Sequence, residues 1–344
     1  MRAAVLHSPG DIRIERVSRP TITGPGQVLL AVEVCGVCGS DIGRMMVKGA
    51  HAMPLICGHE FSGRVVDASD DVVDLASGDL VTVPPLIPCN RCDRCREGQF
   101  SLCQDYDYFG SRRDGAYTET VVSPATNVVK VPDGVDPVAA AMTDPAAIAL
   151  HALRKTRLSL GSRVAVVGAG PIGLFAIQFA RLAGASVVAA IDISEAKLSS
   201  ASTAGADGVF LDAKSCSEQY PAGFDIVFES AGVPVAENAA ITLCAPQGEA
   251  VFVGIPLTDV SIDVGNFSHF LRQEITLHGS WNSFSAPWPG SEWTDTLQLF
   301  ASGELRWEFM VTHDLPIEEV PRMLPIMHER SEHTSKVIFR PESS

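Results

Sequence analysis

Four of the nine cysteines lie within fifteen residues, at Cys89, Cys92, Cys95 and Cys103. The spacing C-x2-C-x2-C-x7-C lets one short loop wrap four thiolates around a tetrahedral ion, with Zn–S distances of about 2.3 Å. Protein would then fill every ligand position, so a zinc ion there would be structural. An iron–sulfur cluster is the competing interpretation, but the bacterial ferredoxin run needs a different fourth spacing. Four metal-free cysteines are disfavoured, because the loop has nothing apolar to bury them. The short spacings predict no regular secondary structure between the cysteines.

A second group of possible ligands precedes this loop. Cys38, His59 and Glu60 offer a thiolate, an imidazole and a carboxylate, the mixed set that catalytic zinc uses when one position stays open. Any one of these residues alone is more often structural, so spacing makes them only candidates. Cys57, Cys216 and Cys244 are predicted to be buried small hydrophobes.

A glycine-rich turn predicts dinucleotide binding. Gly168, Gly170 and Gly173, with Pro171 and Ile172 between them, follow the strand-like RVAVV and precede the helix-like LFAIQFARLAG. The first glycine permits the tight turn, the second lets the backbone approach the pyrophosphate, and the third allows close helix packing. The alternative is a glycine-rich turn in an α/β domain without a cofactor.

An acid at the end of the next apolar run indicates which dinucleotide is bound. Asp192 stands nineteen residues beyond Gly173, where the fold places a carboxylate on the adenosine ribose. The same carboxylate would repel a 2′-phosphate, so NAD is favoured over NADP. Ligands bind at the carboxyl ends of parallel strands, which predicts a further group on the nicotinamide side: Ala231, Val253, Gly254, Ile255, Ser280 and Asn282.

The elements that position these residues change character along the chain. The first third has short β-branched runs broken by Gly and Pro, which predicts many short strands. From about Asp144, apolar runs alternate with Ala-rich helical stretches, which predicts a parallel, doubly wound sheet. An amphipathic helix and a strand, SKVIFRP, then close the chain. We expect a catalytic domain at 1–143, a nucleotide-binding domain at 144–284 and a return to the first domain at 285–344, with a cleft between the domains.

Composition excludes some classes of partner. The 344 residues carry 26 Lys+Arg and 41 Asp+Glu, a formal net charge of −15 that repels nucleic acids and anionic membranes. The N-terminus resembles no signal peptide, and no apolar run is long enough to span a bilayer. We therefore expect a soluble, cytoplasmic protein.

The ordered set of motifs resembles a known family. CGVCGSD (35–41), GHEFSG (58–63), the four-cysteine loop and VGAGPIG together resemble the zinc-containing medium-chain dehydrogenases over nearly the whole chain. The resemblance implies a mostly-β GroES-like catalytic domain and a Rossmann α/β domain. It also implies that Cys38, His59 and Glu60 hold a catalytic zinc, giving two zinc ions per chain, while Cys35 and Cys57 only flank that site.

The same resemblance implies two further catalytic residues. In the family's sugar-alcohol branch a glutamate usually completes the metal shell or reaches it through water, and Asp144 stands at that position here. Its side chain is one methylene shorter, so coordination at about 2.0–2.2 Å would need a backbone shift, and Asp144 is expected as a ligand or one water away. Ser40 is implied to pass the alcohol proton outward. The relay histidine of the simple-alcohol enzymes is missing, with Gly43 in that neighbourhood.

Two segments, GSRRDGAY (110–117) and GSWNSFSAPWPGSEW (279–293), look most like the sugar-alcohol branch. They imply hydride transfer to NAD from a secondary alcohol of a polyol, a sugar alcohol or its phosphate, giving a ketose. A phosphate group on the substrate could be bound by four basic residues, Arg44, Lys48, Arg112 and Arg113, although surface arginines are usually only solvated. The alternatives are a threonine or simple-alcohol dehydrogenase, a zinc-free reductase and a non-catalytic NAD-binding protein. Relatives imply a homodimer or homotetramer.

Overall fold

The computed structural model describes residues 1–256 and 258–341. They form two compact units, one from residues 1–144 together with the segment that begins at Phe284, and one from Pro145–Ser283. The chain thus returns to its first unit, and Asp144 lies there rather than with the nucleotide-binding segment in which the sequence analysis placed it. Among the described residues, no helix combines the length and the apolar character needed to cross a membrane.

The first unit is built mainly from short strands in three sheets. The sheets have the orders β2-β1-β4, β10-β6-β5-β3-β18-β17 and β7-β8, and β9 also pairs with β3. The central strand β3 alternates buried and half-buried residues along most of its length, as a strand with one face on the core does. The bounds are β1 Arg2–Ser8, β2 Asp11–Arg16, β3 Gln27–Gly36, β4 Leu55–Ile56, β5 Glu60–Ala68, β6 Leu80–Thr82, β7 Leu86–Ile87, β8 Asp107–Tyr108, β9 Thr120–Pro124, β10 Val129–Lys130, β17 Val311–Pro316 and β18 Lys336–Arg340.

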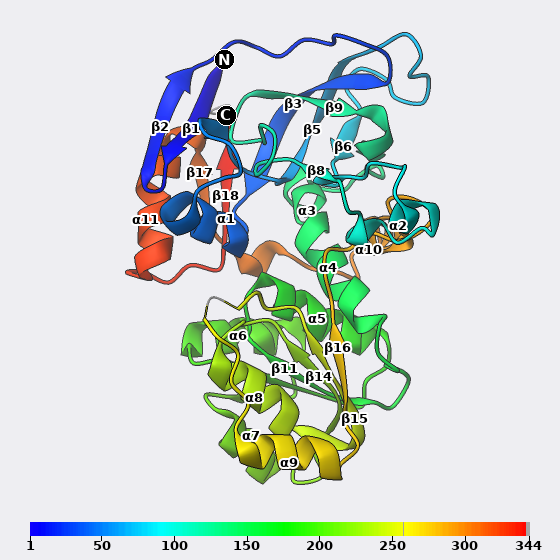
Figure 1. The fold of residues 1–344 in the computed structure, drawn as a ribbon, viewed down its shortest axis with the longest axis vertical. Helices are drawn as coiled ribbons and strands as arrows, with labels where there is room; N and C mark the ends of the chain where they lie inside the picture. The colour runs from blue at the N-terminus through cyan, green and yellow to red at the C-terminus, as the bar shows by residue number, and fades with distance from the viewer. Residues whose placement is uncertain (257, 342–344) are drawn as a thin grey trace. The chain divides into compact units, whose positions relative to one another are not determined.

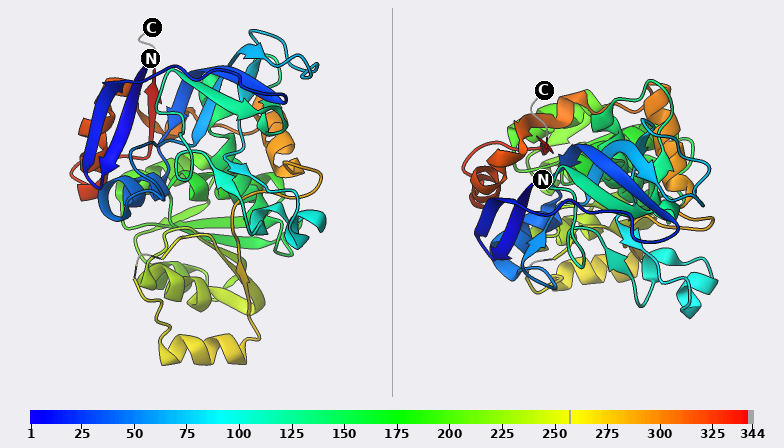
Figure 2. Two further views of the ribbon diagram at one scale, coloured as in Figure 1. Left: turned by 45° about the horizontal axis from the view of Figure 1, so that its top comes forward. Right: turned by 90° about the horizontal axis from the view of Figure 1, so that it is seen from above.

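Short helices and turns connect these strands (Figure 1). The helices are α1 Gly39–Gly43, α2 Asp93–Arg96, α3 Pro137–Ala141, α10 Ser291–Ala301 and α11 Val320–Glu329, and α4 Thr143–Leu153 runs from the first unit into the second. A π-helical turn covers Arg44–Lys48, and 3-10 turns cover Phe100–Leu102, Ala125–Asn127, Glu308–Met310 and Ile317–Glu319. Strands β1 and β18 lie near each other in both Figure 1 and Figure 2, and Arg2 donates a hydrogen bond to the Pro341 carbonyl at 2.7 Å.

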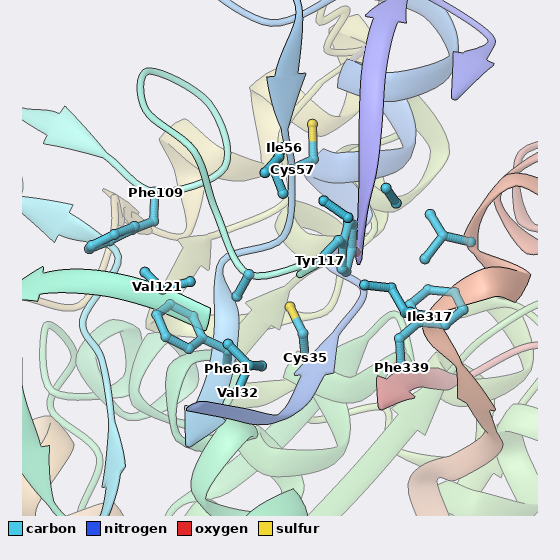
Figure 3. Close-up of a cluster of buried hydrophobic side chains, with 14 of the residues drawn as sticks. Val32, Cys35, Ile56, Cys57, Phe61, Phe109, Tyr117, Val121, Ile317 and Phe339 are labelled. Atoms are coloured by element: carbon cyan, nitrogen blue, oxygen red, sulfur yellow. The ribbon is translucent and has the colours of Figure 1, made fainter. Parts of the chain in front are cut away.

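The core of the first unit lies against β3, β5 and the returning strand β18. Figure 3 shows Cys35, Cys57 and Tyr117 within this apolar cluster, together with Phe61 and Phe339. The rings of Tyr117 and Phe339 meet edge to face, with 5.6 Å between their centroids. Cys35 and Cys57 are at most 1% exposed. Burial raises the pKa of the Cys57 thiol to about 12, so it behaves as an apolar side chain.

The cysteine-rich loop contains more regular structure than its spacing predicts. A single helical turn, α2, begins directly after Cys92 and includes Cys95, and the 3-10 turn Phe100–Leu102 follows. The expectation of no regular secondary structure there was wrong. One turn of helix brings residues three positions apart onto the same side, so α2 places two cysteines with C-x2-C spacing close together.

The second unit is a six-stranded parallel sheet of order β13-β12-β11-β14-β15-β16. The order reverses direction between β11 and β14, which defines the topological switch point of a doubly wound sheet. Helices α5 and α6 pack together on one face and α8 with α9 on the other (Figure 1). The bounds are β11 Arg163–Val167, β12 Val187–Ile191, β13 Gly208–Phe210, β14 Phe224–Glu229, β15 Cys244–Phe252, β16 Thr276–Gly279, α5 Pro171–Leu182, α6 Glu195–Ala204, α7 Ala213–Gln219, α8 Pro234–Thr242 and α9 Val264–Arg272.

Candidate functional site

The four loop cysteines converge in the first unit. One ligand atom from each of Cys89, Cys92, Cys95 and Cys103 lies within 4.8 Å of the others. The Sγ atoms of Cys89 and Cys95 are 3.9 Å apart, and those of Cys92 and Cys103 are 4.0 Å apart. Four sulfurs at about 2.3 Å from a tetrahedral zinc would be about 3.8 Å from one another. The arrangement therefore fits a zinc ion held by four thiolates.

The backbone around this loop favours thiolates at part of the site. Backbone N–H groups, that of Gln104 first, lower the pKa of Cys92 to about 6. The Cys89 N–H also donates to Cys103 Sγ at 3.3 Å, and the Cys92 N–H donates to Cys89 Sγ at 3.4 Å. Burial instead raises the pKa of Cys95 to about 12. A cation at the centre would supply the charge that a buried thiolate at Cys95 needs.

The three possible ligands of the second metal site, which would leave one position open, also converge. Ligand atoms of Cys38, His59 and Glu60 lie within 4.8 Å of one another. Cys38 is the N-cap residue of α1. Glu60 is the first residue of β5, which pairs with β3, and His59 directly precedes it. His59 and Glu60 are each 2% exposed, whereas Cys38 is half-buried. Cys38 is thus the most exposed of the three possible ligands.

A buried aspartate, Asp41, supports His59 and the start of α1. Its Oδ1 accepts a hydrogen bond from Arg44 at 2.6 Å and lies 3.2 Å from His59 Nδ1. Its Oδ2 accepts from the Tyr117 hydroxyl at 3.3 Å and the Cys38 N–H at 3.4 Å. Burial favours the neutral carboxyl group, but His59 and Arg44 outweigh it and lower the pKa of Asp41.

A lysine from the far end of the chain faces Glu60. The Lys336 ammonium group pairs with Glu60 Oε2 and donates to the Val37 carbonyl at 3.2 Å, and Lys336 is only 1% exposed. The two residues stand on β18 and β5, which flank β3, and their side chains meet over Gly36. A Cβ on Gly36 would come within 2.8 Å of both Glu60 Oε2 and Lys336 Cε. The pairing leaves the other carboxylate oxygen of Glu60 for a metal ion.

Asp144 lies beside this group but outside the mutual 4.8 Å set. It is 3% exposed, and its Oδ2 is buried with no hydrogen-bond partner among the described residues. Burial is the main cause that raises the pKa of Asp144, to about 7, and Glu60 adds to it while His59 opposes it. An unpaired buried carboxylate oxygen next to three possible ligands is what a missing cation would satisfy.

The unpartnered Asp144 Oδ2, beside the sulfur, imidazole and carboxyl donors of Cys38, His59 and Glu60, fits a divalent metal such as zinc. The Ser40 hydroxyl lies in this site and donates to Cys38 Sγ at 3.3 Å. The Tyr108 ring meets the His59 ring edge to face at 5.5 Å. Burial is the main cause that raises the pKa of Tyr108, followed by the nearby Asp144 and Cys38, so this phenol stays neutral beside the donor set.

The four basic residues proposed for a substrate phosphate have different surroundings. Arg44 is tied to Asp41, Arg112 lies 4.5 Å from the centroid of the Tyr106 ring, and Arg113 lies 3.5 Å from Asp107. Lys48 is exposed at the end of the π-helical turn. Arg44 is the member of this set next to the donor group.

The glycine-rich turn in the second unit has the geometry that its three glycines predict. Gly168 follows β11 with a φ of +98°, and a Cβ on Gly173 would lie 1.9 Å from the Gly168 carbonyl oxygen. Gly170 is the N-cap of α5, Pro171 is the first helical residue, and no heavy atom lies within 4 Å of a Cβ built on Gly170. Open space at a helix N-terminus is what a pyrophosphate needs.

Asp192 follows β12 and is held by backbone groups. Its Oδ2 accepts from the Ala169 N–H at 2.9 Å and its Oδ1 from the Ser194 N–H at 3.0 Å, while the Lys197 ammonium lies 3.9 Å from Oδ2. The carboxylate is therefore fixed beside the glycine-rich turn.

The remaining predicted cofactor residues follow the next strands. Ala231 follows β14, Val253–Ile255 follow β15, and Ser280 and Asn282 follow β16. Ser280 Oγ and Asn282 Nδ2 are buried without a hydrogen-bond partner among the described residues. Asn282 has a φ of +55°. Both residues therefore keep unused hydrogen-bonding atoms just beyond the end of β16.

Sequence reasoning did not assign Asp41, Lys336, Tyr108 or Glu229 to a site. Asp41 stood within the CGVCGSD motif, so its position three residues after Cys38 was an available signal. Lys336 lies 276 residues from Glu60, and no local pattern links them. Glu229 is 0% exposed at the end of β14, which only the folded strand reveals.

Comparison with known proteins defines the class. Residues 24–133 match the alcohol dehydrogenase GroES-like domain, and residues 171–302 match the zinc-binding dehydrogenase domain. This chain is also 35% identical to a curated dehydrogenase, in an alignment that covers 91% of this chain. It therefore belongs to the zinc-binding alcohol dehydrogenase family, and it combines a GroES-like domain with a Rossmann domain.

That relative is the galactitol 1-phosphate 5-dehydrogenase of Escherichia coli K12, of which 92% is covered. The crystal structure of the E. coli enzyme matches with a TM-score of 0.94 and 33% identity, covering 99% of this chain and 100% of that one. A sorbitol dehydrogenase from Bombyx mori is 29% identical over 94% of both chains. A Sinorhizobium meliloti 1021 structure, described as a zinc-binding dehydrogenase bound to NADP, matches with a TM-score of 0.89 and 30% identity, covering 99% of each chain.

Proposed function

We propose that this enzyme oxidises a secondary alcohol of a polyol, a sugar alcohol or a sugar-alcohol phosphate to a ketose and transfers the hydride to NAD. The observation that carries the proposal is the convergence of Cys38, His59 and Glu60 beside Asp144, whose buried Oδ2 has no hydrogen-bond partner among the described residues. The relatives named for galactitol 1-phosphate and sorbitol support a polyol substrate. Intact metal donors argue against a zinc-free reductase and a non-catalytic NAD-binding protein.

In this proposal each group has a defined role. Cys38, His59 and Glu60 hold a catalytic zinc, which when bound acts as a Lewis acid on the substrate hydroxyl. Asp144, which lies beside these donors but outside the mutual ligand set, completes the metal shell as a further ligand or through one water. Ser40 accepts the alcohol proton and passes it outward. Cys89, Cys92, Cys95 and Cys103 hold a second, structural zinc.

The proposed cofactor is NAD rather than NADP. Asp192 is fixed by the Ala169 and Ser194 N–H groups beside the glycine-rich turn. A carboxylate in that position accepts hydrogen bonds from the ribose hydroxyls and repels a 2′-phosphate. Because the S. meliloti relative was solved with NADP, the test of cofactor use must include both dinucleotides.

A screen of NAD reduction tests the substrate class. Galactitol 1-phosphate, sorbitol, xylitol, threonine and simple primary alcohols are offered to the zinc-loaded enzyme with NAD or NADP. We expect the highest kcat/KM with a polyol or a polyol phosphate and NAD. Activity confined to primary alcohols or threonine would contradict the polyol assignment.

We also propose that the chain forms a homodimer or homotetramer. Strand β16 is the edge of the parallel sheet, and Leu277 on it is 38% exposed. On α9, which packs on α8, Val264, Phe267 and Leu271 are exposed. An uncovered apolar edge of this kind can pair with a second copy. Light scattering should give a multiple of the 36.6 kDa chain mass, and a monomer at micromolar concentration would contradict the proposal.

We place the enzyme in the cytoplasm. All nine cysteines are free in the structure, and thiolate metal sites persist in a reducing compartment. Fractionation of cells that express the tagged full chain checks this. Recovery in an oxidising compartment would contradict it.

A further inference from the structure

The parallel sheet divides a bound dinucleotide into two halves. The pyrophosphate site lies at Gly168–Gly173, between β11 and α5, and Asp192 marks the adenosine side at the end of β12. Strands β14 and β15 lie on the other side of β11. Because the dinucleotide crosses the switch point, its nicotinamide half must lie over the ends of β14 and β15.

A buried carboxylate joins those two strand ends. Glu229 Oε1 accepts hydrogen bonds from the N–H groups of Ala231 and Gly232, both at 2.7 Å. Its backbone carbonyl accepts from the N–H groups of Val253 at 2.9 Å and Gly254 at 3.3 Å. One residue therefore binds the loop after β14 with its side chain and the loop after β15 with its main chain.

The two loops also pack directly on each other. A Cβ on Gly254 would lie 2.2 Å from the Gly232 nitrogen and 2.6 Å from Glu229 Oε2. A Cβ on Gly232, whose φ is +63°, would lie 2.7 Å from the Ile255 carbonyl oxygen. The loops thus meet backbone to backbone, with the Glu229 carboxylate filling the space beside them.

The neighbouring Ser230 extends this connection to the glycine-rich turn. Its hydroxyl donates to the Gly168 carbonyl at 3.0 Å. The turn that receives the pyrophosphate and the loops on the nicotinamide side are therefore joined through two consecutive residues. Glu229 is 0% exposed, so it acts on a ligand only through the backbone that it holds.

We propose that Glu229 is a positioning residue for the nicotinamide half of the cofactor site. This inference rests on the proposed use of a nicotinamide dinucleotide. Without the carboxylate, the N–H groups of Ala231 and Gly232 lose their acceptor and the loop after β14 is no longer fixed against Gly254. Ordering that loop on binding would then weaken the affinity for the dinucleotide. The adenosine side, held by Asp192, is independent of Glu229.

The test compares ligands that fill different parts of the site. NADH fills both halves and AMP only the adenosine side, so their dissociation constants are measured on the zinc-loaded full chain. The variants are Glu229→Met, which has no acceptor, and Glu229→Gln, whose amide oxygen can still accept both N–H groups. Glu249→Met is the matched control, because Glu249 is 3% exposed in β15 and bonds to Arg157 and His278 instead.

We expect Glu229→Met to weaken NADH binding about tenfold or more, since two backbone donors, one of them the buried Gly232 N–H, lose their acceptor, and to change AMP binding less than about twofold. Glu229→Gln should restore most of the NADH affinity, and Glu249→Met should change neither ligand. AMP stoichiometry reports the folded fraction of each variant. Equal weakening of NADH and AMP, or NADH binding unchanged in a folded Glu229→Met, would overturn the inference. A wild-type chain that binds AMP but not NADH would overturn it as well, and one that binds neither would overturn the proposed cofactor and this inference together.

Discussion

At the scale of single residues, the buried carboxylate of Glu60 has a permanent counter-ion in Lys336. Burying either charge alone costs several kcal/mol, whereas the pair is tolerated because each neutralises the other. Lys336 also donates to the Val37 carbonyl, which fixes the ammonium group over Gly36. The pairing therefore holds the Glu60 side chain in place whether or not a metal ion is bound.

Replacing Lys336 by methionine should make the first unit depend more strongly on zinc. The Glu60 carboxylate loses its protein counter-ion, so the apo-protein should be destabilised by about 3 kcal/mol or more. Zinc can then replace the missing cation, so the rise in melting temperature on zinc addition should be larger in Lys336→Met than in the wild type. Calorimetry with and without zinc measures both values.

Lys130→Met is the matched control for that experiment. Lys130 makes a surface ion pair with Asp79 at 2.8 Å, and its side chain is 56% exposed. Such pairs contribute little to stability, so the zinc-dependent rise should stay as in the wild type. An equal rise in all three proteins would contradict the counter-ion role of Lys336.

Asp192 carries the prediction on cofactor choice. Asp192→Ala removes the acceptor for the ribose hydroxyls and the repulsion of a 2′-phosphate, so the ratio of kcat/KM for NAD over NADP should fall at least about tenfold. Asp225→Ala is the control, because Asp225 also accepts a backbone N–H, that of Arg163 at 2.7 Å, but at the start of the strands. A ratio that is the same in Asp192→Ala and the wild type would refute the assignment.

Residue patterns predict those parts of a site that are close in sequence. Cys89 to Cys103 and Gly168 to Gly173 each lie on one loop, so spacing alone indicated their chemistry. The roles of Lys336 and Glu229 depend on which strands become neighbours, and the sequence contains no local signal for that. Arg44 shows the opposite case, since its type suggested a phosphate ligand while the structure ties it to Asp41.

At the scale of elements, the turn between β11 and α5 separates two uses of glycine. Gly173 is required by packing, because its hydrogen stands where a Cβ would meet the Gly168 carbonyl at 1.9 Å. Gly170 has an ordinary φ of −77° and open space around it, so the fold itself does not require a glycine there. A ligand that closely approaches the backbone at this position would require a glycine there.

Two alanine substitutions should separate these uses. Gly173→Ala forces α5 away from the turn and should cost about 1–3 kcal/mol of stability as well as NADH affinity. Gly170→Ala should cost less stability than Gly173→Ala, about 1 kcal/mol or less, since it changes only the helix N-cap, and should still weaken NADH binding, because its methyl group occupies the space of the pyrophosphate. Thermal unfolding and NADH titration measure the two effects. Unchanged NADH affinity in Gly170→Ala would contradict the location of the pyrophosphate.

Elements with a strong hydrophobic periodicity could be predicted from the sequence, whereas short elements could not. The alternating strands and helices from Arg163 to Gly279 follow the order that the apolar runs indicated. The single turn of α2 inside the cysteine loop was missed, because one helical turn leaves no periodic signal over four residues. The strand SKVIFRP was predicted, but not that β18 pairs with β3 and so brings Lys336 to Glu60.

At the scale of the whole molecule, the return of the chain to its first unit is part of the site. The segment that begins at Phe284 contributes β17 and β18 to the sheet that contains β3 and β5. It thereby supplies Lys336, while the start of the chain supplies Cys38, His59 and Glu60. The mixed pattern of short helical and strand-like runs in the last sixty or so residues predicted this return.

The central claim is that Cys38, His59 and Glu60 hold a zinc ion that polyol oxidation requires. Zinc content and polyol-dependent NAD reduction should be measured together on the wild type, on Cys38→Ala and on Cys57→Ala. The last variant is the control, because the Cys57 thiol is buried in the core. The account predicts about two zinc ions per chain and full activity in the wild type and Cys57→Ala, and about one zinc ion with no activity in Cys38→Ala. NAD reduction at the wild-type rate in Cys38→Ala would contradict it.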